Sequence, residues 1–75
     1  MIFAVINTMN AVDCIGRVMT THRTLEAAKG SDMAIQSATR KGCGQNSYLP
    51  TVIKELNRRV GKGGFVVEQD IVREN

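Results

Sequence analysis

The sequence predicts a small α+β domain, a two-layer sandwich in which a three-stranded antiparallel sheet carries two helices on one face, in the order β-β-α-α-β. Three observations predict this fold. β-Branched and apolar residues dominate both ends of the chain, helical patterns occupy the middle, and turn residues separate these stretches. With 75 residues, the chain is expected to form a single domain over residues 1–75.

The first strand is predicted at residues 2–9, where β-branched and apolar residues fill a stretch too short for a typical helix. A turn at residues 10–13 and a second strand at residues 14–21 complete a β-hairpin. Gly16, inside this second strand, indicates a bulge or a close approach of backbone. Because the first strand is the most apolar, we expect it to lie at the centre of the sheet.

The first helix is predicted over residues 25–41, with Thr24 as its N-cap. On a helical wheel, small residues gather on the side expected to face the sheet, whereas charged and polar residues, including Gln36, fall on the solvent side. Residues 30–32 are also typical of a helix end followed by a new N-cap. Two short helices joined at Gly30 are therefore an alternative.

A second helix is predicted after a glycine-containing loop at residues 42–46, with Ser47 as its N-cap and Pro50 in its first turn. Gly61 would end this helix, and a last strand is predicted over residues 65–72. The helix is predicted because apolar residues recur at the spacing i, i+3, i+4, i+7 and i+11, at Leu49, Val52, Ile53, Leu56 and Val60.

Basic residues are concentrated in the middle of a chain whose formal net charge is +3. Lys54, Arg58 and Lys62 recur at i, i+4 and i+8 on the predicted second helix, opposite its apolar stripe. Together with Arg40 and Lys41, they predict a basic surface that could bind phosphate groups. A purely structural interpretation competes, because cations in the last turn of a helix complement its dipole.

No residue pattern predicts catalysis, a metal site or a cofactor. Cys14, Cys43 and His22 are the residues best suited to such chemistry, but their spacing matches no zinc pattern and His22 is the only histidine available as a base. Two cysteines are too few for a secreted disulfide framework, and neither a signal peptide nor a membrane-spanning run is visible. The sequence therefore predicts a cytoplasmic protein without membrane association.

These observations predict a small non-enzymatic intracellular module that docks on a protein partner, as an adaptor, an accessory protein or an inhibitor. The alternative prediction is a module that binds DNA or RNA through the basic helical stripe, although Phe3 and Phe65 are expected in the core and leave few aromatics for stacking. An edge strand could also pair with a second copy to form a homodimer. The candidate interaction residues are Arg40, Lys41, Tyr48, Lys54, Arg58 and Lys62.

Overall fold

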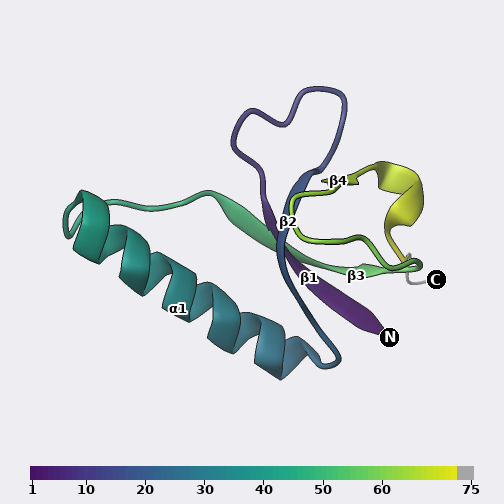
Figure 1. Cartoon of the computed structure of the whole chain (residues 1–75), viewed down its shortest axis with the longest axis horizontal. Helices are drawn as coiled ribbons and strands as arrows, with labels where there is room; N and C mark the ends of the chain where they lie inside the picture. Colours follow the sequence, from purple (N-terminus) through teal and green to yellow (C-terminus); the bar gives the residue numbers. More distant parts are fainter. Residues whose placement is uncertain (73–75) are drawn as a thin grey trace.

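The computed structural model describes residues 1–72 and shows one long helix, a short 3-10 helix and a four-stranded antiparallel sheet with the strand order β3-β1-β2-β4 (Figure 1). The α+β character is confirmed. The predicted sandwich of three strands and two helices is wrong. The elements in chain order are β1 (Ile2–Asn7), β2 (Gly16–His22), α1 (Leu25–Cys43), β3 (Thr51–Leu56), β4 (Phe65–Val66) and the 3-10 helix η1 (Glu68–Asp70).

β1 lies between β3 and β2, which confirms its predicted central position. It pairs with β3 along its whole length and with β2 from Phe3 onward. Ala4, Val5 and Ile6 are all fully buried, so β1 is covered on both faces. A strand covered on both faces needs an uninterrupted apolar run rather than an alternating pattern, as the sequence of β1 has.

The second predicted helix, over residues 47–60, is wrong, because Thr51–Leu56 form β3 and pair antiparallel with β1. β3 begins with three consecutive β-branched residues, which favour a strand. Val52 and Leu56 are four residues apart, a spacing that satisfies the two-residue period of a strand as well as the period of a helix. Both contribute to the same core cluster in the structure. The buried β1 also needs a neighbour along this edge, and β3 supplies it.

The first predicted helix is present as α1 and is continuous, so the alternative with two helices joined at Gly30 is wrong. Thr24 is the N-cap as predicted, because its Oγ1 accepts a hydrogen bond of 3.1 Å from the backbone N–H of Ala27. The helix extends past the predicted end at residue 41 to Cys43. It is capped by Gly44, whose φ of 115° suits glycine.

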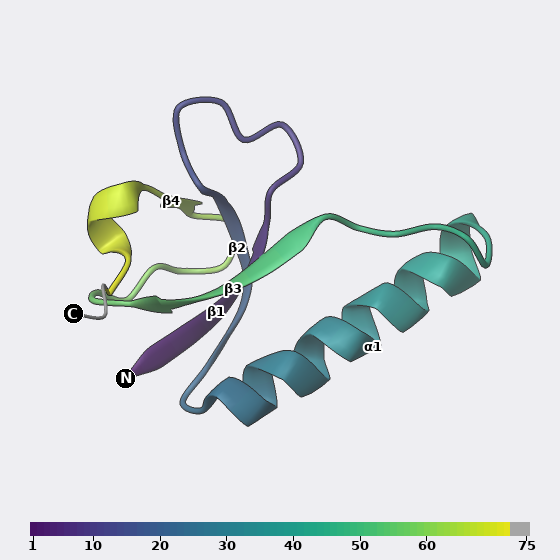
Figure 2. The same ribbon diagram turned by 180° about the vertical axis from the view of Figure 1, so that it is seen from behind.

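α1 packs across β1, β2 and β3 on one face of the sheet (Figure 2). Ala28 is fully buried there, whereas Gln36, predicted on the solvent side, is only 7% exposed. The amide of Gln36 donates to the carbonyl of Leu49 at 2.7 Å and accepts from the Leu49 N–H at 2.9 Å. Gln36 turns inward because it satisfies the backbone of the segment that leads into β3.

Residues 57–72, here called the closing segment, cover the sheet face opposite α1 (Figures 1 and 2). The segment meets both edges of the sheet, because β4 pairs with β2 and Ile71 forms a bridge with Leu56 of β3. The predicted last strand over residues 65–72 is therefore wrong beyond Val66. The core under this segment consists of Ala4, Ile6, Val18, Leu56, Val60 and Val66, with Ile15, Val52 and Ile71 packed against it.

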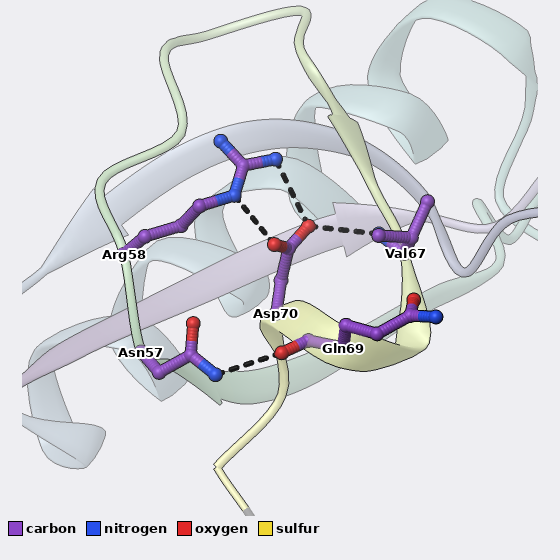
Figure 3. Close-up of polar contacts among 5 residues, drawn as sticks. All are labelled: Asn57, Arg58, Val67, Gln69 and Asp70. Atoms are coloured by element: carbon purple, nitrogen blue, oxygen red, sulfur yellow. Dashed lines mark hydrogen bonds and ion pairs between the residues drawn. The ribbon is translucent and has the colours of Figure 1, made fainter.

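Asp70 fastens the closing segment from inside (Figure 3). Its carboxylate is 7% exposed and accepts bonds from Arg58 Nε, from Arg58 Nη2 at 3.0 Å and from the Val67 N–H at 3.0 Å. These contacts favour the charged form, so Arg58 first and then the Val67 N–H lower the pKa of Asp70, and the carboxylate raises the pKa of Arg58. Asn57 adds a bond from its side-chain amide to the carbonyl of Gln69 at 2.8 Å.

Gly16 marks a close approach of backbone, as its position in the second strand predicts. A Cβ at this position would lie 2.2 Å from the carbonyl oxygen of Asn7 and 2.8 Å from Cγ2 of Ile6. The bulge in the hairpin lies elsewhere, at the register shift between Val5 and Ile6. Only glycine lets β1 and β2 meet so closely at the end of the hairpin.

Candidate functional site

The structure separates the residues of the predicted basic surface. Lys54 lies on β3, whereas Arg58 and Lys62 lie in the closing segment, so the helical stripe that joined them in the prediction does not exist. Arg58 is also bound to Asp70. The last turn of α1, which carries Arg40 and Lys41, lies at the opposite end of the molecule from the closing segment (Figure 1). The five cations therefore share no single surface.

Arg40 and Lys41 lie beside a shallow hollow of about 410 Å³ that Ser37 and Gln45 also line. Both cations stand in the last turn of α1, where they complement the negative end of the helix dipole. Tyr48, in the loop that follows, is 67% exposed. Tyr48 is therefore exposed, as the predicted interaction surface requires. The positions of Arg40 and Lys41 are explained by the helix dipole alone.

A different surface gathers apolar side chains at the end of the sheet where β1 leads into β2. Met9 and Val12 are 54% and 77% exposed in the loop between these strands, which projects beyond the sheet (Figure 1). Phe65 of β4 is 56% exposed, and Arg17 of β2 stands opposite it in the strand pairing. We call Met9, Val12, Arg17 and Phe65 the hairpin-loop surface.

The loop that carries Met9 and Val12 is fixed by its own backbone. The Met9 N–H donates to Oδ1 of Asn7 at 2.8 Å, and the Val12 N–H donates to the carbonyl of Asn10 at 3.0 Å. Asn10 and Asp13 adopt φ values of 59° and 60°, a left-handed conformation that Asn and Asp tolerate better than most residues. The backbone of the loop is therefore held in a defined conformation, from which Met9 and Val12 extend.

Arg17 forms the polar margin of the hairpin-loop surface, beside the apolar ring of Phe65. The guanidinium carbon of Arg17 lies 4.5 Å from the centroid of the Phe65 ring, a cation–π contact. A hollow of about 270 Å³ separates this pair from the loop, and Met9, Ala11 and Cys14 line it. The arrangement can seat an apolar side chain in the hollow and a negative group on Arg17.

Sequence reasoning missed the hairpin-loop surface. Phe65 was assigned to the core as part of an eight-residue strand, but β4 has only two residues and leaves the ring outside. Arg17 and Phe65 share the face of the sheet on which α1 packs, at a corner where Phe65 stays exposed. The signal available in the sequence was the pair of large apolar residues, Met9 and Val12, beside the turn residues Asn10 and Asp13.

Within residues 1–72, no three His, Cys, Asp or Glu side chains come together in a way that could hold a metal ion. Both cysteines are free, Cys14 half-buried and Cys43 exposed. Along the same part of the chain, no helix combines the length and apolar character needed to cross a membrane.

The fold and the hairpin-loop surface define a small α+β domain, built on an antiparallel sheet, with an exposed apolar surface at one end. No protein-family model, curated protein or solved structure matches the chain.

Proposed function

We propose that this protein is a small interaction module that docks on a protein partner through its hairpin-loop surface. The observation that carries the proposal is the exposure of Met9 and Phe65 around one hollow, with the exposed Val12 in the same loop as Met9. Apolar and aromatic side chains at the centre of a patch, with a polar margin, are typical of protein interfaces.

The charge of the surface defines the partner more closely. Arg17 forms no salt bridge within residues 1–72, and its guanidinium lies over the Phe65 ring. Arginine held on an aromatic ring retains its donors for a carboxylate. The partner is therefore a protein that offers an apolar side chain for the hollow and an acidic side chain for Arg17.

The module acts by binding rather than by catalysis, and it works in the cytoplasm. Its two free cysteines suit a reducing compartment, because secreted domains of this size usually rely on disulfides. Cys14 lines the hollow beside Met9, so an oxidised Cys14 would alter the proposed contact surface.

Site-specific photo-crosslinking in the cells that naturally make this protein tests the proposed function. A crosslinking side chain replaces Val12 in one variant and Met33, an apolar residue 72% exposed on α1, in a control variant. We expect one discrete protein to be captured from position 12, to be absent from position 33, and to be lost when Met9→Ser and Phe65→Ser are added.

Purified partner must then bind with an affinity at least about tenfold lower for Arg17→Glu, because reversing this charge sets it against an acidic side chain. Equal capture from positions 12 and 33 contradicts the proposal. If position 12 captures only a second copy of the chain, the protein is a homodimer instead. The β3 edge is already paired with the closing segment at Glu55 and Asn57.

Binding of single-stranded nucleic acid is the second candidate function, and the exposed Phe65 ring favours it. An aromatic face flanked by an arginine is a platform on which a base can stack. This function predicts fluorescence-anisotropy binding that weakens steeply from about 50 to 200 mM salt, and loss of binding in Phe65→Ser. Salt-independent binding, or binding unchanged by Phe65→Ser, excludes this use of Phe65.

A further inference from the structure

A second hollow lies at the other end of β1, where β1 begins, β2 ends and β3 leads into the closing segment. It has a volume of about 240 Å³. Ile2 of β1 and the end of β2 form one side, and the closing segment contributes Arg59. The lining residues are Ile2, Thr21, His22, Arg23 and Arg59, and we call this site the arginine hollow.

The charge of the arginine hollow is uncompensated. Arg23 and Arg59 form no hydrogen bond or salt bridge within residues 1–72, in contrast to the neighbouring Arg58, which is bound to Asp70. None of the acidic residues among residues 1–72 lines the hollow. The acidic residues closest in sequence, Glu26 in the first turn of α1 and Glu55 of β3, are not among the residues that line the hollow.

Both arginines extend from backbone that is held in place. Arg23 is flanked by His22, whose Nε2 lies 3.0 Å from Oγ1 of Thr20, and by the N-cap Thr24. On the other side, Arg59 follows Asn57 and Arg58, which bond to Gln69 and Asp70 of the closing segment (Figure 3). Two arginines from separate segments of the chain therefore line one hollow, and their side chains have no partner within residues 1–72.

We infer that the arginine hollow binds a small phosphate-bearing anion. The planar fork of an arginine matches two oxygens of a phosphoryl group, and two arginines around one hollow suit a multiply charged anion. The Thr21 hydroxyl adds a neutral donor at the same site. The volume is below that of typical pockets for drug-sized ligands, which favours an anion of the size of pyrophosphate. This inference is independent of the hairpin-loop surface.

An NMR titration of the full chain with sodium pyrophosphate at constant ionic strength tests the inference. We expect saturable shifts of the backbone amides of Thr21, His22 and Arg23, with weaker binding of inorganic phosphate because it carries less charge. Arg23→Gln together with Arg59→Gln should weaken binding by about tenfold or more. Arg23→Lys together with Arg59→Lys should weaken it less, because the charge remains and only the planar fork is lost.

Lys29→Gln together with Arg40→Gln is the matched control, since it removes the same charge at two residues of α1 away from the arginine hollow. An equal loss of affinity in this control overturns the inference, because net charge alone would then account for the binding. Shifts spread over the surface without saturation overturn it as well. Binding of a short single-stranded DNA with no binding of pyrophosphate assigns the arginines to a nucleic-acid backbone and also overturns the small-anion site.

Discussion

The two faces of the sheet are stabilised in different ways. The face under the closing segment is apolar, with Ile6 and Val66 fully buried and no hydrogen-bonding side chain in its core cluster. On the face under α1, small and polar contacts surround the buried Val5. There the Thr20 and Ser31 hydroxyls lie 2.9 Å apart, and Thr51 donates to Asp32 at 2.7 Å. Burial stabilises the first face, whereas the second is oriented by directional bonds.

This difference between the two faces shows how a chain of 75 residues fixes the position of the 19-residue helix α1. Small side chains such as Ala28 let α1 approach the sheet but bury little apolar area. Hydrogen bonds from Gln36 to Leu49 and from Thr51 to Asp32 then select one register for the helix, because a buried polar group that loses its partner is costly. On the apolar face, the irregular cover is fastened outside the core cluster, by the bonds of Asp70 with Arg58 and Val67.

The largest effect is expected on the apolar face. Ile6→Ala removes a fully buried side chain from the core cluster and should lower the free energy of unfolding by about 2–5 kcal/mol. Urea denaturation followed by circular dichroism measures the change. Met33→Ala, at a residue 72% exposed, is the control and should stay within about 0.5 kcal/mol of the wild type. A loss at Ile6 no larger than at Met33 would show that this face is not the main source of stability.

A smaller and more local effect is expected under α1. Gln36→Leu keeps the volume but leaves the N–H and carbonyl of Leu49 without their partner, which should cost about 1–3 kcal/mol. Hydrogen exchange should show faster exchange of the Leu49 amide than of amides in β1. Gln45→Leu, at an exposed loop residue, is the control. Unchanged protection of Leu49 would contradict the role given to Gln36.

The closing segment should release in acid. Folding lowers the pKa of Asp70 because Arg58 and the Val67 N–H favour the carboxylate. The stabilisation is therefore present above the unfolded value near 3.8 and is lost as the pH falls through the lower folded pKa. Asp70→Asn should lower the urea midpoint at about pH 7 and flatten its fall in acid. The effect is modest because Arg58 is 54% exposed.

The smallest expected effect has the opposite sign. Gly30 lies inside the continuous α1, and a Cβ there meets no atom within 4 Å. Gly30→Ala should therefore stabilise the protein by about 0.4–1 kcal/mol, mainly by restricting the unfolded chain. Thermal unfolding measures the gain. A destabilised variant would show that Gly30 has a role beyond helix continuity.

The sequence contained enough information for the N-terminal half of the fold. The apolar run of β1, the N-cap Thr24 and the restricted Gly16 each depend on local chemistry, and the structure has all three in the predicted roles. The register of α1 was partly missed, because Gln36 turns inward only to satisfy a backbone that lies thirteen positions away.

The C-terminal half could not be predicted in the same way because its apolar spacing is ambiguous. The spacing of Val52 and Leu56 fits a strand as well as a helix. The other apolar residues of the predicted helical pattern lie in different parts of the structure. Leu49 lies in the loop held by Gln36, Ile53 pairs with Val5 in the sheet, and Val60 belongs to the closing segment. The basic stripe depended on this helix, so the candidate surface built on it was lost with the helix.

The closing segment has a consequence for how the protein is made. Val66 pairs with β2 and Ile71 forms a bridge with β3, so both edges of the sheet are completed by residues of the same C-terminal segment. Residues 57–72 follow β1, β2, α1 and β3 in the chain, and until they are available the apolar face of β1 is open to water. The nascent chain can form its hairpin and α1 early, but it cannot bury its core until synthesis has passed Ile71. A chaperone that recognises exposed apolar surface should therefore bind the chain until residues 57–72 are free to fold onto β1.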